Sequence, residues 1–168
     1  MEEPSIWVSQ HLDCAYVQVK GKGTFHNAHY AKQFAESVIK KGVHAFVFDL
    51  KDCTYIDSTF MGMMAGVACS LKPLGSTSII NPSPKNFELL QNLGLDRVMT
   101  IKSEPTQLTT NHFSAVGKES QPPDKTAVAK TMLESHETLV NVDERNAPKF
   151  QDVLTFLREK LGDSDKDP

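Results

Sequence analysis

The residues best suited to chemistry are Asp57-Ser58-Thr59, which stand directly before an apolar helical segment. An aspartate in this place can cap a helix by accepting hydrogen bonds from backbone N–H groups two or three residues further on. The hydroxyl of Ser58 would then lie at the helix start, where free N–H groups and the positive end of the helix dipole stabilise an added phosphate. Two interpretations follow. Either Asp57 is only a cap, with Ser58 and Thr59 in the first turn, or Ser58 is a phosphorylation switch.

The switch interpretation depends on the three large apolar residues after Ser58. If Phe60, Met61 and Met63 form an exposed patch, a doubly charged phosphate on Ser58 beside Asp57 would repel a partner docked there. Core packing is the alternative for the methionines, because flexible thioether side chains suit both cores and adaptable interfaces.

The other candidate sites carry weaker signals. His26 and His29 lie three residues apart at a helix start and could share a metal, but no third ligand is evident, so surface histidines are favoured. Cys53 has no histidine close in sequence to activate it, which favours packing. His136 falls on a predicted apolar face and is expected to be a partly buried, hydrogen-bonded side chain rather than a ligand. No metal site and no catalytic set is predicted, so the chain is expected not to be an enzyme.

Length and composition indicate one soluble domain. The 168 residues are 39% hydrophobic and 23% charged, which is average for globular proteins and enough to bury a core without disulfides. No apolar run of about 18 residues and no signal-peptide pattern occur, which favours the cytoplasm and no membrane partner. Acidic and basic residues balance up to residue 121, so the formal charge of −3 arises in 122–168. Without a basic stripe, no nucleic-acid partner is expected. The three cysteines, with no C-x-x-C, are expected to be reduced and mostly buried.

The elements that would position Ser58 alternate between strands and helices. Hydrophobic periodicity predicts strands over 5–10, 14–20, 43–50, 78–80 and 98–101, and helices that begin near Asn27, Asp57 and Pro84. The run 43–50 is almost wholly apolar, as a strand covered on both faces requires, and is the predicted centre of the sheet. This order predicts an α/β fold, a mixed sheet flanked by helices, in a domain over 1–102.

The remaining residues are predicted to extend this domain. Proline and polar residues over 103–123 indicate a surface linker that is partly mobile. Two apolar helical stripes over 124–161 indicate a helical hairpin or extension. Its second helix is expected near Asn146, because Pro148 would clash inside a continuous helix, although one kinked helix is the alternative. The polar tail 162–168 is expected to fray.

Three motifs in order resemble the STAS domain family of bacterial anti-sigma-factor antagonists. They are the stretch 53–62 around Asp57-Ser58-Thr59, then Asn81-Pro82-Ser83, then Leu93-Gly94-Leu95. The family pattern is an apolar residue, Asp, Ser, Ser or Thr, Gly, Leu, Gly, followed by a strand ending in Asn-Pro and a Gly-Leu after the next helix. The resemblance covers about 5–102. Two positions depart from it: Phe60 replaces the usual Gly, and Gly21-Lys22-Gly23-Thr24 lacks an acidic residue that many members carry near the first helix.

The resemblance implies partner switching. In this family the unphosphorylated antagonist binds an anti-sigma factor, often a serine kinase of the histidine-kinase-like ATPase fold, and so frees the sigma factor. Phosphorylation of the serine after the aspartate breaks the complex, and a phosphatase restores it. Carried over by position, Ser58 is the phospho-acceptor. No cofactor is implied for this chain, because the partner supplies ATP and magnesium. The residues expected to contact the partner are Asp57, Thr59, Phe60, Met61, Gly62, Met63 and Thr24.

Two other functions stay open on the sequence alone. One is a scaffold or sensor in a larger assembly, with the C-terminal helices as the docking surface and Ser58 unmodified. The other is a small module that binds a nucleotide at the helix start near Asp57, although no Gly-rich phosphate motif supports it.

Overall fold

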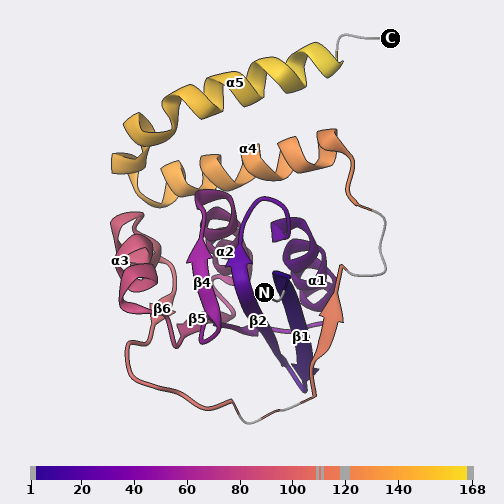
Figure 1. Cartoon of the computed structure of the whole chain (residues 1–168), viewed down its shortest axis with the longest axis vertical. Helices are drawn as coiled ribbons and strands as arrows, with labels where there is room; N and C mark the ends of the chain where they lie inside the picture. Colours follow the sequence, from indigo (N-terminus) through magenta and orange to yellow (C-terminus); the bar gives the residue numbers. More distant parts are fainter. Residues whose placement is uncertain (1–2, 109, 111, 118–121, 166–168) are drawn as a thin grey trace.

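A mixed sheet forms the centre of the fold (Figure 1). The structure is a computed structural model that describes residues 3–108, 110, 112–117 and 122–165. Within those residues the strand order is β6-β5-β3-β2-β1-β7, and β4 pairs with the end of β2. The strands are β1 (Ser5–His11), β2 (Cys14–Gly23), β3 (Ala45–Asp49), β4 (Cys53–Ile56), β5 (Ser76–Ile80), β6 (Thr100–Ile101) and β7 (Ser114–Val116).

The strand β3 lies in the middle of the sheet, as its apolar sequence predicts. It pairs in parallel with β2 on one side and with β5 on the other, and both Phe46 and Phe48 are buried. By contrast, β1 and β2 form an antiparallel hairpin in which buried and partly exposed residues alternate. Because parallel neighbours need crossover connections, the helices between these strands must lie on the sheet rather than at its edge.

Five helices cover this sheet or pack on one another in the described part of the chain. They are α1 (Ala28–Lys40), α2 (Ser58–Leu71), α3 (Pro84–Asn92), α4 (Lys125–Val142) and α5 (Ala147–Asp165). Helices α1 and α2 contact each other and the sheet, α4 lies across α2, and α5 lies against α4 (Figure 1). Helix α2 therefore has the sheet on one side and α4 on the other. None of the helices described is long and apolar enough to cross a membrane.

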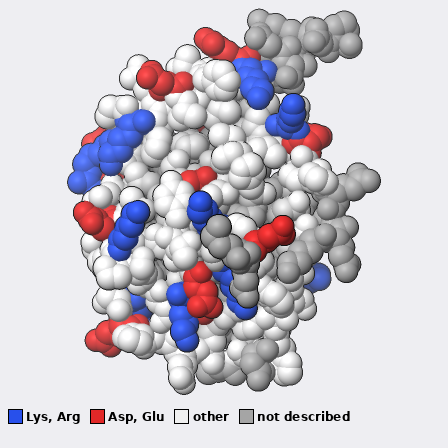
Figure 2. All heavy atoms as spheres, in the orientation of Figure 1, with Lys and Arg blue, Asp and Glu red and all other residues white. Residues whose placement is uncertain are grey.

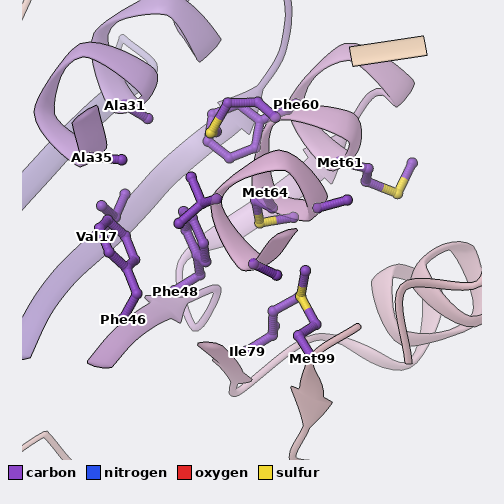
Figure 3. Close-up of a cluster of buried hydrophobic side chains, with 14 of the residues drawn as sticks. Val17, Ala31, Ala35, Phe46, Phe48, Phe60, Met61, Met64, Ile79 and Met99 are labelled. Carbon is purple, nitrogen blue, oxygen red and sulfur yellow. The ribbon is translucent and has the colours of Figure 1, made fainter. Parts of the chain in front are cut away.

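The main core fills the space between the sheet and helices α1 and α2. Figure 3 shows Phe60 and Met64 of α2 close to Val17, Phe46 and Phe48 of the sheet, with Met61 set apart from them. All five of those core side chains are at most 1% exposed. Burying one such large apolar side chain contributes about 1.5–3 kcal/mol, so this cluster supplies much of the free energy of folding.

Most predicted elements are confirmed, including Pro84 at the first position of α3 and two separate C-terminal helices. Some differ. The strand β4 was expected to be loop, and the strand expected over 98–101 is only Thr100–Ile101, after a 3-10 turn at Leu95–Arg97. The segment expected to be a linker contributes β7, which pairs with β1. Residues 162–165, expected to fray, continue α5, whereas 166–168 lie outside the described residues.

Candidate functional site

The start of α2 is fixed by Asp57, as the sequence predicts. Its Oδ1 accepts a hydrogen bond from the Phe60 backbone N–H at 2.9 Å, which caps the helix. Its Oδ2 accepts from the Phe25 backbone N–H, also at 2.9 Å. Asp57 thus joins the helix start to the loop before α1, and Ser58 becomes the first residue of α2 with its hydroxyl at the positive end of the helix dipole.

The loop at 24–27 brings Thr24 beside this helix start. The Asn27 Oδ1 accepts from the Thr24 backbone N–H at 2.9 Å, and its Nδ2 donates to the Lys22 carbonyl at 2.8 Å. Helix α1 begins just after Asn27, as predicted, but the Asn27 side chain does not cap it, because that side chain closes the preceding turn instead. Thr24, Phe25 and Asp57 line one surface groove of about 720 Å³.

Ser58 pairs with a histidine that lies 78 residues further along the chain. Its Oγ lies 2.9 Å from Nε2 of His136, on α4. The other ring nitrogen, Nδ1, lies 2.6 Å from the Met132 carbonyl oxygen. A carbonyl can only accept, so Nδ1 carries the proton, and in the neutral imidazole Nε2 accepts from the Ser58 hydroxyl. His136 is 3% exposed and packs edge-on against Phe150.

The Ser58–His136 pair has a definite chemical capacity. A hydroxyl bonded to an imidazole nitrogen is the arrangement that activates serine nucleophiles, although here a backbone carbonyl orients the ring instead of a carboxylate. A hydroxyl at a helix N-terminus is also a favourable place for a phosphate. In this structure, His136 of α4 pairs with the Ser58 hydroxyl, and Ser58 stays half-buried.

The expected apolar patch is not on the surface. Phe60 is 0%, Met61 4% and Met63 5% exposed. The ring of Phe60 packs so closely on Gly23 that a Cβ there would lie 3.2 Å from the ring. The prediction of an exposed patch was wrong because α2 is covered twice, by the sheet and by α4. Thr59, also expected to face a partner, is buried as well.

Gly62 marks the closest approach of α2 and α4. A Cβ at this position would lie 2.3 Å from the Ser135 carbonyl oxygen, which leaves no room for any side chain. An ion pair between Lys32 of α1 and Glu134 joins α4 to the body on the same side. Beside this contact, α1, α2 and α4 border a groove of about 390 Å³.

The junction of α4 and α5 is anchored to the body by buried polar groups. Asn146 is fully buried, and its Nδ2 donates to the carbonyl oxygens of Leu93 at 2.9 Å and Leu139 at 2.8 Å. The carboxylate of Asp143, which is 1% exposed, receives hydrogen bonds from Arg145 and lies 3.7 Å from Arg97. Leu93 belongs to the third motif identified in the sequence, so this motif binds the junction of the C-terminal helices.

Replacing Asp143 by asparagine is expected to lower stability at neutral pH and to have little effect in acid. The hydrogen bonds and charge of Arg145, with Arg97 nearby, lower the pKa of Asp143 from 3.8 to about 2. The folded protein therefore keeps this carboxylate charged where the unfolded chain already binds a proton, so its stabilisation is full above pH 3.8 and is lost as the pH falls towards 2. Urea unfolding of both proteins should show a difference in the free energy of unfolding that narrows below about pH 4. A difference of constant size would contradict the assignment.

The remaining predicted sites have ordinary surroundings. Burial raises the pKa of the Cys53 thiol, which disfavours the nucleophilic thiolate. Cys69, in contrast, is exposed, against the expectation of mostly buried thiols. Among the residues described, no three His, Cys, Asp or Glu side chains gather as metal ligands, so His26 and His29 have no third partner there. On the face shown in Figure 2, basic and acidic side chains are interspersed.

The pairing of Ser58 with His136 was missed by sequence reasoning. His136 was expected to be a partly buried, hydrogen-bonded side chain; it is hydrogen-bonded as expected but almost fully buried, and no local signal in the sequence names its partner. The second motif has a structural role. Asn81 donates to Asp49 at 3.0 Å and to the Thr106 carbonyl at 2.8 Å, and so ties β3 and β5 to the segment after β6.

Comparison with known proteins identifies a matching family and solved structures with a similar fold. A family model described as STAS domain matches residues 5–109, which end before α4. Among curated proteins no similar sequence is found. The solved structure of the anti-sigma factor antagonist SpoIIAA in its unphosphorylated form is 15% identical, with a TM-score of 0.50 over 59% of this chain and 88% of that one. An anti-sigma factor antagonist from Mycobacterium paratuberculosis is 19% identical, with a TM-score of 0.55 over 61% and 87%. The phosphorylated form of SpoIIAA from Bacillus is 19% identical, with a TM-score of 0.50 over 59% and 92%. At these identities the likeness shows a shared fold.

Proposed function

Because the chain belongs to the STAS domain family, we propose that it is a non-catalytic anti-sigma-factor antagonist whose partner binding is switched by phosphorylation of Ser58. The observation that carries this proposal is the position of Ser58. It is the first residue of α2, next to a capping aspartate, where a helix terminus favours an added phosphate. Solved structures of the same fold include an antagonist in unphosphorylated and phosphorylated forms.

The proposed partner is an anti-sigma factor, in the form of a serine kinase of the histidine-kinase-like ATPase fold. It supplies ATP and magnesium, and this chain supplies the hydroxyl. In the transfer, a bond forms between Ser58 Oγ and the γ-phosphorus of ATP while the bond to the β-phosphate bridging oxygen breaks. ADP leaves, and the hydroxyl proton passes to a base. A phosphatase returns the serine by hydrolysis to inorganic phosphate.

The proposed contact surface lies at the start of α2. Thr24 and Asp57 border the groove already described. Thr59, Met61, Gly62 and Met63 lie along the helix beyond Ser58 and are buried in this structure, so a partner reaches them only if α4 moves away. Phe60 is assigned to the core, since its ring is fully buried against Gly23.

Changing Ser58 to aspartate is expected to weaken capture of the kinase-like partner by at least about tenfold, because a new unpaired charge in an interface costs several kcal/mol. The measurement is a pull-down from lysate of the native organism, with wild type, Ser58→Asp and Ser37→Asp as parallel baits. Ser37 is exposed on α1 and serves as the matched control. Recovered proteins are quantified by mass spectrometry. The purified ATPase should then label wild type, and not Ser58→Ala, with γ-labelled ATP.

Two results would contradict this function. Equal recovery of the same proteins by wild type and Ser58→Asp would make Ser58 a structural residue. The C-terminal helices would then become the docking surface of a scaffold protein, which is the alternative function. Labelling of Ser58→Ala as strongly as wild type would place the phospho-acceptor elsewhere.

A further inference from the structure

The helical pair α4–α5 occupies the part of α2 that the proposed partner would need. His136 holds the Ser58 hydroxyl, and Ser135 lies against Gly62 one turn further along. From these contacts we propose that α4 is a built-in competitor for this face of α2, and that phosphorylation of Ser58 releases it. The inference rests on the proposed function in one respect, that Ser58 is the phospho-acceptor.

Ser58 is half-buried, and the closed arrangement leaves no space for a phosphate in the direction in which its hydroxyl points. With Oγ 2.9 Å from His136 Nε2, a phosphoryl group on Oγ would have to enter the volume that the imidazole fills. The ring cannot simply turn aside while α4 stays, because its Nδ1 is bonded to Met132 of the same helix and Phe150 packs on it. The phosphate would also add negative charge beside Asp57.

Helix α4 also cannot give way by a small shift. The Ser135 backbone rests directly on the backbone of Gly62, so the two helices are already at their closest approach there. Interfaces packed this closely have discrete arrangements rather than a continuous range of separations. A phosphate large enough to part Ser58 from His136 therefore breaks the Gly62–Ser135 contact as well.

The α4–α5 pair is built to move as a unit. Ala129, Leu157 and Leu161 form an apolar cluster between α4 and α5 that is separate from the main core, with Met132, Leu133 and Val153 packed against it. The inner face of α4, by contrast, buries the polar residues Thr131, Ser135 and His136, while Leu139, close to the α4–α5 junction, joins the main core. Polar contacts of this kind are typical of surfaces that separate.

The junction of α4 and α5 anchors the helical pair to the body of the protein. Asn146 and Asp143 fix the α4–α5 junction to Leu93 and Arg97, at the C-terminal end of α4. Release of α4 around this anchor would expose Met61 and Met63. With a phosphate on Ser58 beside Asp57 the kinase-like partner is still repelled, so it binds only the minor population of unphosphorylated protein in which α4 is open. Since the closed form hides this face, its stability sets how far partner affinity is reduced.

The test is hydrogen exchange of the full chain carrying phosphoserine at position 58, inserted during translation. The matched control carries phosphoserine at exposed Ser37 on α1. Exchange is followed by mass spectrometry in peptides from α4 and, as an internal reference, from β3. We expect exchange in α4 to rise at least about tenfold with phosphoserine at 58 and to stay unchanged with phosphoserine at 37, while β3 stays protected in both.

A second variant keeps the test independent of the phosphate. His136→Ala removes the hydrogen bond to Ser58 without adding charge, and is expected to raise exchange in α4 while β3 stays protected. Equal protection of α4 with and without phosphate at Ser58 would overturn the proposal, and so would loss of protection in β3 together with α4, because that result is unfolding.

This outcome can be separated from failure of the proposed function. The exchange experiment needs no partner. If α4 is released but wild type and Ser58→Asp capture the same proteins, the release of α4 is supported and the proposed function is contradicted. If a kinase labels Ser58 while α4 stays protected from exchange, the proposed function is supported and the release of α4 is contradicted.

Discussion

Truncation of Phe60 to alanine is expected to lower the free energy of unfolding by about 3–5 kcal/mol, the usual cost of removing a fully buried phenylalanine. The ring is 0% exposed and lies over Gly23 on β2, among the side chains that Figure 3 shows. This loss is a large share of the stability of an ordinary domain, which is about 5–15 kcal/mol. Urea unfolding followed by circular dichroism measures it.

Phe156 offers the matched control for this prediction. It is the same residue type on α5, but it is 60% exposed, so Phe156→Ala should change stability by no more than about 0.5 kcal/mol. Equal effects of the two substitutions would contradict the assignment of Phe60 to the core. Gly23, opposite the ring, leaves the space for it, since a Cβ there would lie 3.2 Å from the ring.

The local chemistry of the sequence was sufficient to predict the helix starts of the site. Asp57 before an apolar run and Pro84 after Ser83 act within three or four residues of themselves, and both cap or begin helices as predicted. The central strand β3 was also predictable, because burial on both faces demands an almost wholly apolar run. These signals depend only on neighbours in the chain.

The elements that were missed depend on distant residues. The strand β7 has only three residues and gains its order by pairing with β1, more than a hundred positions earlier. The contact of Ser58 with His136 likewise requires α4 to fold back across α2. No local pattern encodes either pairing, since each is selected by the packing of the whole chain.

The sequence of α2 itself indicates that a second element must pack on this helix besides the sheet. Ten of its residues are buried, and apolar side chains surround the helix on every side. A helix that is apolar all round must be covered all round, whereas the sheet covers only one face. The prediction of an exposed patch at Met61 and Met63 did not consider that the apolar C-terminal helices would pack on this face of α2.

Changing Gly62 to alanine is expected to destabilise the protein, although alanine is the better helix former. The new Cβ would lie 2.3 Å from the Ser135 carbonyl oxygen, a backbone atom that can move only with the whole of α4. Overpacking of this kind costs about 1–3 kcal/mol, which exceeds the gain of about 1 kcal/mol from helix propensity. Urea unfolding gives the sign, and hydrogen exchange shows whether α4 loses protection ahead of β3.

Gly66, one turn further along α2, provides the control within the same helix. A Cβ there would have no neighbour within 4 Å, so Gly66→Ala should stabilise the protein by about 0.5–1 kcal/mol through helix propensity alone. The opposite signs of these two substitutions would come from α4 alone, because residue type, helix and backbone conformation are otherwise shared. If both substitutions stabilise the protein, α4 does not rest on Gly62 in solution. The face of α2 after Ser58 would then be open to a partner without any release step.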